Sequence, residues 1–298
     1  MLRTMRLNKK YLLELLTDYL ALTKPRVMSL LLFSAATGTF LGAGGVPNLH
    51  QLITVLIGGA LASGGASALN MWFEADLDRK MGRTKGRPVA QGRIRPRNAL
   101  IYGIILNLIA FSILSYFTTI LAGILAITGT VLYIGLYTIL LKRSTVQNIV
   151  IGGAAGAMPP LVGYAAITNT LGLNSWFLFL IVFLWTPPHF WALALMIRKD
   201  YSRVGIPMLP VVAGKRHTTL QILLYSVLVS IVSVLFSAID PRLNHIYLLG
   251  SVFLGVILIY YAFRLHFNAP KGFAWSLYRY SLLYLAGIFT LIMVDVSL

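Results

Sequence analysis

Three polar residues recur at four-residue intervals in the first third of the chain: Asn70, Glu74 and Asp78. In a helix this spacing places all three on one face. Two carboxylates and an amide oxygen at the end of a helix suit Mg²⁺, a hard cation that takes oxygen ligands and shares its shell with substrate phosphates. The spacing therefore predicts a magnesium site that also holds a phosphorylated substrate.

Basic residues follow these three ligand candidates at once. They are Arg79, Lys80, Arg83, Lys85 and Arg87. Arginine gives phosphate oxygens two parallel hydrogen bonds, so this segment predicts an anion beside the metal. Asp76 projects from nearly the opposite side of an ideal helix, where it either pairs with a loop cation or marks a point at which the helix unwinds. The alternative to a metal and phosphate site is a ladder of charged side chains that snorkel to the membrane surface. Such a ladder explains the cations, but it does not explain why Glu74, Asp76 and Asp78 are acids at every second position.

The elements that must carry these residues are apolar. Of 298 residues, 58% are hydrophobic and 11% are charged, and the mean hydropathy is +0.80. A soluble domain carries about a quarter charged residues. Apolar stretches near the length that crosses about 30 Å of hydrocarbon recur along the chain. There is no cysteine, which excludes disulfides and thiolate metal sites.

We predict an all-α polytopic membrane protein, a single domain over residues 1–298 with a basic N-terminal segment at 1–25. About nine transmembrane helices should surround a central cavity beneath a cytoplasmic cap. The spans are expected at 26–45, 49–72, 98–117, 119–140, 147–167, 174–196, 218–239, 245–265 and 276–295.

The basic residues give the expected orientation. All 25 Lys and Arg residues except Arg242 fall on one side of this map. By the positive-inside rule the N-terminus is cytoplasmic and, after nine spans, the C-terminus is periplasmic, in a bacterial inner membrane. The net charge of +17 then reflects topology and the anionic headgroups of the lipid bilayer, and we expect no nucleic acid partner. No small-residue cleavage site follows the basic start, so we expect no cleaved signal peptide.

The remaining acids and the glycines have plainer interpretations. Glu14, Asp18, Asp240 and Asp295 lie near the termini or in an opposite-side loop, so we expect them to be solvated or interfacial. Gly-Gly pairs at 58–59, 64–65 and 152–153 fall inside spans, where small residues allow close helix packing.

The string Asn70-x3-Glu74-x-Asp76-x-Asp78 before an Arg-rich loop resembles the first aspartate-rich motif of the intramembrane aromatic prenyltransferases, the UbiA superfamily. Continued through Met81, Arg83-Thr84 and Arg87-Pro88, it is similar to the haem O synthases, the branch that farnesylates protohaem IX. Further strings agree in the same order, from Thr23-Lys24-Pro25-Arg26 to Val212: Tyr137-Thr138 with Lys142-Arg143 and Gln147-Asn148; residues 186–192 (Thr-Pro-Pro-His-Phe-Trp-Ala); and Asp200-Tyr201 with residues 205–210 (Gly-Ile-Pro-Met-Leu-Pro).

This resemblance implies a reaction. Mg²⁺ and cationic side chains would ionise farnesyl diphosphate by stabilising the leaving pyrophosphate. A vinyl group of haem b would attack farnesyl C1 and water would capture the resulting cation, giving haem O. A haem A synthase or a terminal oxidase assembly partner would receive the product.

The resemblance also implies roles for particular residues. It gives Asn70, Glu74 and Asp78 as metal ligands and catalytic residues, together with Asp200. The substrate-binding set that it implies is Asp76, Arg83, Arg87, Tyr137, Lys142, Arg143, Asn148, His189 and Lys199, with Arg83, Arg87, Lys142 and Arg143 on the diphosphate.

Two positions need separate comment. The superfamily's second motif carries acids four residues apart, but the position four before Asp200 is Met196, so a second Mg²⁺ held by paired carboxylates is in doubt. His189 follows Pro187-Pro188, which should kink or end its helix. It would ligate haem iron, contact a propionate or accept a proton, or else it is a packed, hydrogen-bonded residue at a helix break.

Two rival functions remain open. A prenyltransferase acting on a soluble aromatic acid or a quinone precursor would share the Asn70–Asp78 site but should lack the strings at 186–192 and 207–210. A transporter or channel fits nine spans, but it needs polar groups along mid-membrane positions, whereas the acids here gather at one face.

Overall fold

The computed structural model describes residues 2–268, Pro270 and residues 272–298, with side chains from Leu12 onward. Lys271, one of the cations used to predict the orientation, lies outside the described residues, as do the side chains of Arg3, Arg6, Lys9 and Lys10. The described part is helical and contains no strand. The predicted all-α class is therefore confirmed.

Within residues 2–268 and 272–298, nine helices are long and apolar enough to cross a membrane, which confirms the predicted number. They are α2 (Pro25–Ala43), α3 (Leu49–Phe73), α5 (Pro96–Phe117), α6 with η1 (Ile120–Val131 and Leu132–Leu141), α7 with α8 (Asn148–Gly156 and Met158–Thr168), α9 (Leu173–Met196), α12 (Gly214–Ile239), α13 (His245–Phe267) and α14 (Phe273–Asp295). Each boundary lies within a few residues of the prediction. The chain is a multi-pass membrane protein.

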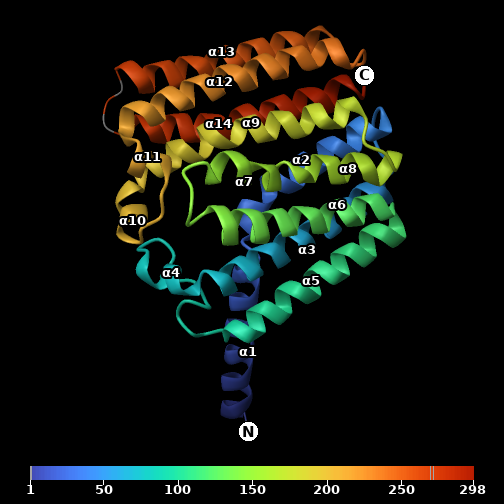
Figure 1. Ribbon diagram of the computed structural model, residues 1–298. Helices are drawn as coiled ribbons and strands as arrows, with labels where there is room; N and C mark the ends of the chain where they lie inside the picture. Colours follow the sequence, from blue (N-terminus) through green and yellow to red (C-terminus); the bar gives the residue numbers. More distant parts are fainter. Residues whose placement is uncertain (1, 269, 271) are drawn as a thin grey trace.

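Seven of these spans form a ring in the order α2, α3, α5, α6–η1, α7–α8, α9 and α14, and α14 closes the ring against α2. The other two, α12 and α13, pack outside α9 and α14 and make the outer layer at the top of Figure 1. The α2–α8 contact crosses the ring. Hydrophobic clusters fill both halves, one around α9, α12 and α14 and one around α2, α3 and α8.

Glycines allow the closest contacts in the ring. A side chain on Gly65 of α3 would meet the Gly103 carbonyl oxygen of α5 at 2.7 Å, and one on Gly163 of α8 would meet the Ala35 oxygen of α2 at 1.9 Å. Only a residue without a Cβ fits at either position. This agrees with the expectation that the glycine pairs inside the spans permit close helix packing.

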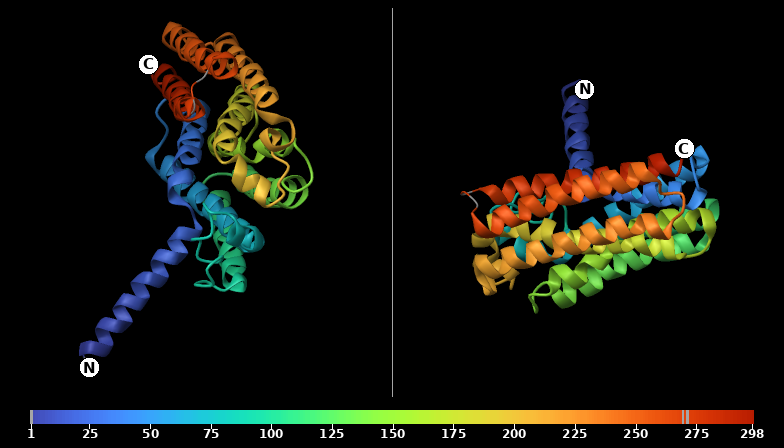
Figure 2. Two further views of the ribbon diagram at one scale, coloured as in Figure 1. Left: turned by 90° about the vertical axis from the view of Figure 1, so that its left-hand side faces the viewer. Right: turned by 90° about the horizontal axis from the view of Figure 1, so that it is seen from above.

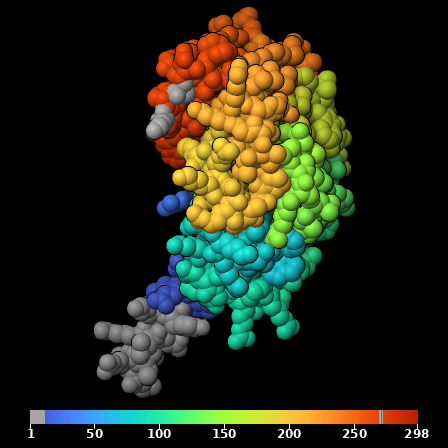
Figure 3. Space-filling model, turned by 60° about the vertical axis from the view of Figure 1, so that its left-hand side comes forward, coloured from blue at the N-terminus to red at the C-terminus, as the bar shows by residue number. Residues whose placement is uncertain are grey.

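Short elements gather on one side of the ring and form the cap. They are α4 (Ala75–Lys80), the segment 81–95, the loop 142–147, α10 (Arg198–Arg203) and α11 (Leu209–Val212). Figure 3 shows this face, with the cyan-to-teal segment 75–95, the green loop and the yellow-to-orange segment 198–216 side by side. The C-terminus lies at the opposite side, on the right of Figure 1. The structure thus brings together the segments that carry the predicted site.

Two acids differ from expectation. Asp240 is fully buried, because Arg242 donates to both of its oxygens at 2.6 and 2.8 Å and Asn174 donates at 2.8 Å. Asp295 is also buried, and its Oδ2 accepts the backbone N–H groups of Asn244 and Tyr247, which start α13. The prediction that these acids could be solvated was wrong, because each is buried at the end of a spanning helix and satisfies donors where two helices meet.

Arg242, the one exception to the charge rule, belongs to this buried network. Besides Asp240, it donates to the Leu41 carbonyl at 3.0 Å, at the end of α2. Its charge is therefore compensated by a carboxylate two residues away, and it holds α2 to the connection between α12 and α13.

Two spans contain features that bear on the predictions, a π-helix in one and two prolines in the other. The second half of the fourth span, η1, is a π-helix, in which hydrogen bonds join residues five apart: Lys142 N donates to Tyr137 O at 2.8 Å. The sixth span, α9, runs through Pro187 and Pro188 to Met196, so the helix does not end at the two prolines.

Candidate active site

The three predicted ligand residues, together called the ligand face, lie where α3 ends and α4 begins. Glu74 N donates to Asn70 O and Asp78 N donates to Glu74 O, each at 2.9 Å, although α3 ends at Phe73 and α4 begins at Ala75, with Glu74 in a turn between them (φ −95°, ψ 13°). All three residues are buried: Asn70 and Glu74 are each 2% exposed, and Asp78 is 3% exposed. The Asn70 amide donates to Glu74 Oε2 at 3.0 Å, as their four-residue spacing predicts, whereas the helix is interrupted at Glu74 before it reaches Asp78.

Each of these three side chains faces its own cation. Lys24 Nζ lies 3.2 Å from Asn70 Oδ1, Lys142 Nζ donates to Glu74 Oε1, and Arg87 NH1 lies 2.8 Å from both oxygens of Asp78. The cations come from the α1–α2 corner, the loop after η1 and the segment after α4. A buried carboxylate without a partner costs several kcal/mol, so these contacts stabilise acids that belong to a functional face.

Lys24 was not among the predicted site residues. It joins α1 (Leu2–Leu22) to α2 in a left-handed conformation, φ 51° and ψ 60°, directly before Pro25. A strained backbone at a non-glycine residue is characteristic of functional sites. Burial, and then the charges of Arg87 and Lys142, lower the pKa of Lys24 from 10.5 to about 7. Its place in the string Thr23–Arg26 was the only sequence signal.

Thr138 was part of a quoted string but had no predicted role. Its hydroxyl donates to the Tyr133 carbonyl at 2.8 Å, the i−5 contact of the π-helix, and therefore accepts from Asn70 Nδ2 at 3.3 Å. Asn70 Nδ2 also donates to Glu74 Oε2 at 3.0 Å. Since both amide hydrogens are engaged, the amide oxygen of Asn70 is the atom turned toward Lys24.

Tyr137 lies beside this face. Its ring stacks on Tyr133 with centroids 5.9 Å apart, and Lys142 Nζ lies 5.8 Å from its centroid. A side chain on Gly152 of α7 would meet the Tyr137 ring at 2.3 Å, so the glycine makes room for the ring. The structure therefore places Tyr137 and Lys142 together, next to Glu74.

Four predicted substrate residues lie farther out. Arg143 pairs with Asp76 at 3.2 Å, with 40 and 57% of the two side chains exposed, and its guanidinium lies 5.5 Å from the Phe73 ring. Partial burial raises the pKa of Asp76, but the Arg143 hydrogen bonds outweigh it and bring the pKa below 3.8. Arg83 and Lys199 are exposed on the cap. These side chains flank the ligand face without contacting it.

Two further predicted residues sit at the rim of the cap. Asn148 is fully buried at the start of α7; its Nδ2 donates to Thr145 O at 2.8 Å, and its Oδ1 has no partner among the described residues. Asp200 pairs with Arg203 at 3.5 Å and lies about 4 Å from where a side chain on Gly82 would begin. The position four before Asp200 is Met196, which is exposed, so the paired acid of the second motif is missing at that position.

His189 lies away from the ligand face, where α9 meets α14; we call this contact region the α9–α14 wall. Its ring is stacked between Trp185 and Tyr278, with centroids at 4.3 and 4.6 Å, and Nδ1 lies 2.8 Å from Ser281 Oγ. The only proton of Ser281 goes to the Tyr278 carbonyl at 2.7 Å. Nδ1 must therefore carry the imidazole proton, which leaves Nε2 as the basic nitrogen. The Tyr278 ring stacks in turn on Trp275 at 5.2 Å.

The donor chemistry of the ligand face suits a hard divalent cation. Among the described residues, no group of three or more His, Cys, Asp or Glu side chains forms a self-sufficient metal cage. Two carboxylates and an amide oxygen form a partial shell, which is typical of Mg²⁺ that completes its coordination with phosphate oxygens and water.

Comparison with known families gives an independent result. The profile of the UbiA prenyltransferase family matches residues 31–287. A protoheme IX farnesyltransferase of Chloroflexus aurantiacus is 49% identical over 278 residues, which cover 93% of this chain and 47% of that protein. A protein of the same name from Symbiobacterium thermophilum is 46% identical over 286 residues, which cover 95% of each. The chain spans about half the length of the relatives in Chloroflexus, Thermus and Roseiflexus.

Two solved structures share the fold. A structure described as digeranylgeranylglyceryl phosphate synthase superposes with a TM-score of 0.78 at 19% identity and covers 95% of this chain and 99% of its own. A UbiA homolog from Archaeoglobus fulgidus, bound to GPP and Mg²⁺, gives 0.64 at 16% identity and covers 92% and 99%. At such identities the likeness shows the fold alone.

Proposed function

The chain belongs to the UbiA prenyltransferase family, and we propose that it transfers the farnesyl group of farnesyl diphosphate to a vinyl group of haem b, with addition of water, to give haem O and diphosphate. The observation that carries this proposal is the buried face of Asn70, Glu74 and Asp78, with a cation against each side chain. Relatives that match along nearly the whole of both chains are named protoheme IX farnesyltransferase, which supports haem as the acceptor.

Mg²⁺ fits this face, as the donor set and the A. fulgidus homolog bound to GPP and Mg²⁺ both suggest. Asn70, Glu74 and Asp78 would hold it, and when bound it would neutralise charge on the diphosphate leaving group. With Met196 in place of an acid, Asp200 has no paired carboxylate for a second ion, and we assign it to positioning through the cap.

The chain's own cations would bind the diphosphate. Arg87, Lys142 and Lys24 already point at the ligand face, and Arg83, Arg143 and Lys199 lie around it. When the C1–O bond of farnesyl diphosphate breaks, the electron pair leaves with pyrophosphate, and fixed cations stabilise that charge without reorganising. The stacked Tyr133 and Tyr137 rings offer π-faces to the allylic cation left behind.

The acceptor would enter between α9, α14 and the cap. The π electrons of the haem vinyl group form the new bond to farnesyl C1, water adds to the resulting cation, and one proton is lost. His189, whose Nδ1 is engaged with Ser281, would use Nε2 to take a proton or to contact haem. The aromatic stack of Trp185, His189, Tyr278 and Trp275 suits a flat acceptor.

The orientation follows from the basic residues. We place the cap on the cytoplasmic side of a bacterial inner membrane, with Leu298 on the periplasmic side. A haem A synthase or a terminal oxidase assembly factor is the partner that would take up haem O. A periplasmic reporter fused after Leu298 should then be active, and the same reporter fused at Arg95 should be inactive.

The direct test of function is to express the chain in a bacterium that makes only haem b and to weigh the haems extracted from its membranes. We expect a new haem heavier than haem b by one farnesyl group and one hydroxyl group. Haem b alone, from membranes that contain the folded protein, would refute the proposal.

A further inference from the structure

The N-terminal helix α1 does not join the ring. It projects from the bundle across the direction of the spanning helices in Figure 1 and in both views of Figure 2. A helix with this direction runs along a membrane surface instead of through the bilayer. It leads directly to Lys24, so its end lies on the cap side of the protein.

The last turns of α1 are anchored in the bundle. Leu22 is fully buried in a cluster with Met71 and Val89. Asp18 pairs with Arg93 at 2.9 Å. Packing thus fixes the direction in which α1 leaves the protein.

The outward side of α1 is a stripe of leucines. Leu12, Leu13, Leu16 and Leu20 are 53, 56, 57 and 60% exposed. Their spacing places them on one side of the helix, with Glu14 opposite. Transfer of these leucine side chains from water into an apolar environment lowers the free energy, so the stripe favours contact with an apolar medium.

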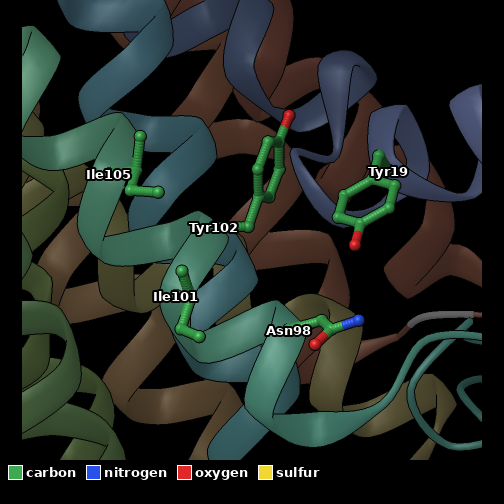
Figure 4. A pocket seen from close by; sticks show the side chains of 5 residues that line it. All are labelled: Tyr19, Asn98, Ile101, Tyr102 and Ile105. Atoms are coloured by element: carbon green, nitrogen blue, oxygen red, sulfur yellow. The ribbon is translucent and has the colours of Figure 1, made fainter.

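The C-terminal part of α1 meets exposed aliphatic side chains of the spanning helix α5. Where α1 meets α5, a pocket of about 220 Å³ is lined by Tyr19, Asn98, Ile101, Tyr102 and Ile105 (Figure 4). Ile101 and Ile105 are among the exposed aliphatic side chains of the spanning helix α5. Aliphatic walls with two phenol groups and an amide at one edge suit an acyl chain near its headgroup.

The sequence ahead of the stripe is basic. Arg3, Arg6, Lys9 and Lys10 precede Leu12 without an acid among them. An amphipathic helix with a basic segment lies in the interface of a bilayer that contains anionic lipid. We propose that α1 is an in-plane membrane helix: its leucines lie among the acyl chains of the leaflet on the cap side, and its basic start binds anionic phospholipid headgroups.

The absence of cysteine makes a direct test simple, because single cysteines can be introduced for a fluorescent label. The matched pair is Leu16→Cys on the leucine stripe and Glu14→Cys on the other side, both at exposed positions. Each labelled full-length protein is placed in nanodiscs of phosphatidylcholine with phosphatidylglycerol. Quenching is measured with bromine-labelled acyl chains and with aqueous iodide.

We expect bromolipid to quench the label at position 16 several times more strongly than the label at position 14, and iodide to show the reverse. Equal access of iodide to both labels would overturn the proposal, because α1 would then stand in water. Protection of position 16 from both quenchers, lost when one protein copy is isolated per nanodisc, would overturn it in favour of a second copy as the occupant.

The headgroup part has its own readout. In the Leu16→Cys protein, we replace Arg3, Arg6, Lys9 and Lys10 by Gln. The equilibrium constant for partition of α1 from water into the bilayer interface should fall by about fivefold for each cation removed. The loss should appear only in nanodiscs with phosphatidylglycerol. If bromolipid quenching of the unsubstituted helix is the same in pure phosphatidylcholine, anionic headgroups are not its partner.

Discussion

Arg87 NH1 lies 2.8 Å from both carboxylate oxygens of Asp78, and the Asp78 side chain is only 4% exposed. The guanidinium thus occupies the side of the carboxylate that a metal ion would need. Lys142 stands against Glu74 and Lys24 against Asn70 in the same way. The ligand face and the anion-binding cations neutralise each other, and several predictions about binding and catalysis depend on this arrangement.

The first prediction concerns the carboxylate itself. Asp78→Asn keeps the shape of the side chain and a hydrogen-bond acceptor for Arg87 but removes the charge that a metal needs. We expect roughly a thousandfold or greater loss in rate, since several kcal/mol of leaving-group stabilisation disappear. The measurement is haem O formation by purified protein that elutes as a folded species.

Asp76→Asn is its matched control. Asp76 lies two residues away, is 57% exposed and pairs only with exposed Arg143. An exposed ion pair contributes about 1 kcal/mol or less, so activity should stay within about fivefold of wild type. Equal losses in the two variants would remove Asp78 from the metal site.

The second prediction concerns the coupling between metal binding and diphosphate binding. A metal ion that takes Asp78 and Glu74 frees Arg87 and Lys142, which then need an anion. Metal and diphosphate should therefore bind with positive coupling, about 5–150-fold in affinity and the same in both directions. Titration calorimetry of Mg²⁺ with and without a non-hydrolysable farnesyl diphosphate analogue measures it. Identical Mg²⁺ affinities in the two titrations would contradict the exchange of partners.

The third prediction concerns Thr138. Its hydroxyl accepts from the Asn70 amide and so fixes which amide atom faces the metal. Thr138→Val keeps the volume but removes the acceptor, and Mg²⁺ affinity should fall about 10–100-fold, as for other residues that orient a metal ligand. Thr138→Ser should restore most of it. A loss of thermal stability without any change in metal affinity would reduce Thr138 to a packing residue.

The fourth prediction concerns His189. If the free Nε2 serves the acceptor, His189→Ala should weaken haem affinity about tenfold or more while the affinity for farnesyl diphosphate is unchanged, because one buried polar contact to haem would be lost. The two affinities are measured by Soret titration and by calorimetry on the same preparation.

Ser281→Ala is the control for this variant. It removes the hydrogen bond that orients the ring but leaves the imidazole in place, so haem affinity should fall less. If both variants lose thermal stability equally and neither changes haem affinity, His189 is a packed residue between α9 and α14.

The sequence predicted the fold well because spanning helices are encoded locally. Each span needs a long apolar stretch, and nothing in the chain competes with that signal. The contact between Asn70 and Glu74 was equally local, since it needs only four-residue spacing on a helix. The partners of these residues could not be derived this way. Thr138 and Lys24 reach Asn70 from far along the chain, and no pattern within one segment indicates that they meet.

The errors have a similar cause. Asp240 and Asp295 look solvated in sequence because they stand near loops, yet in three dimensions each meets donors from another helix. The π-helical register of η1 is another feature that apolar composition does not encode, and it sets the i−5 contact between Thr138 and Tyr133.

The acceptor is tested most directly by competition in one tube. Purified protein in lipid receives farnesyl diphosphate, Mg²⁺ and equal concentrations of haem b and 4-hydroxybenzoate, and the products are separated and weighed. We predict that haem b gains one farnesyl group and one hydroxyl group while 4-hydroxybenzoate is unchanged. Farnesylated 4-hydroxybenzoate with unaltered haem b would contradict the proposed function and assign the Asn70–Asp78 site to a different aromatic acceptor.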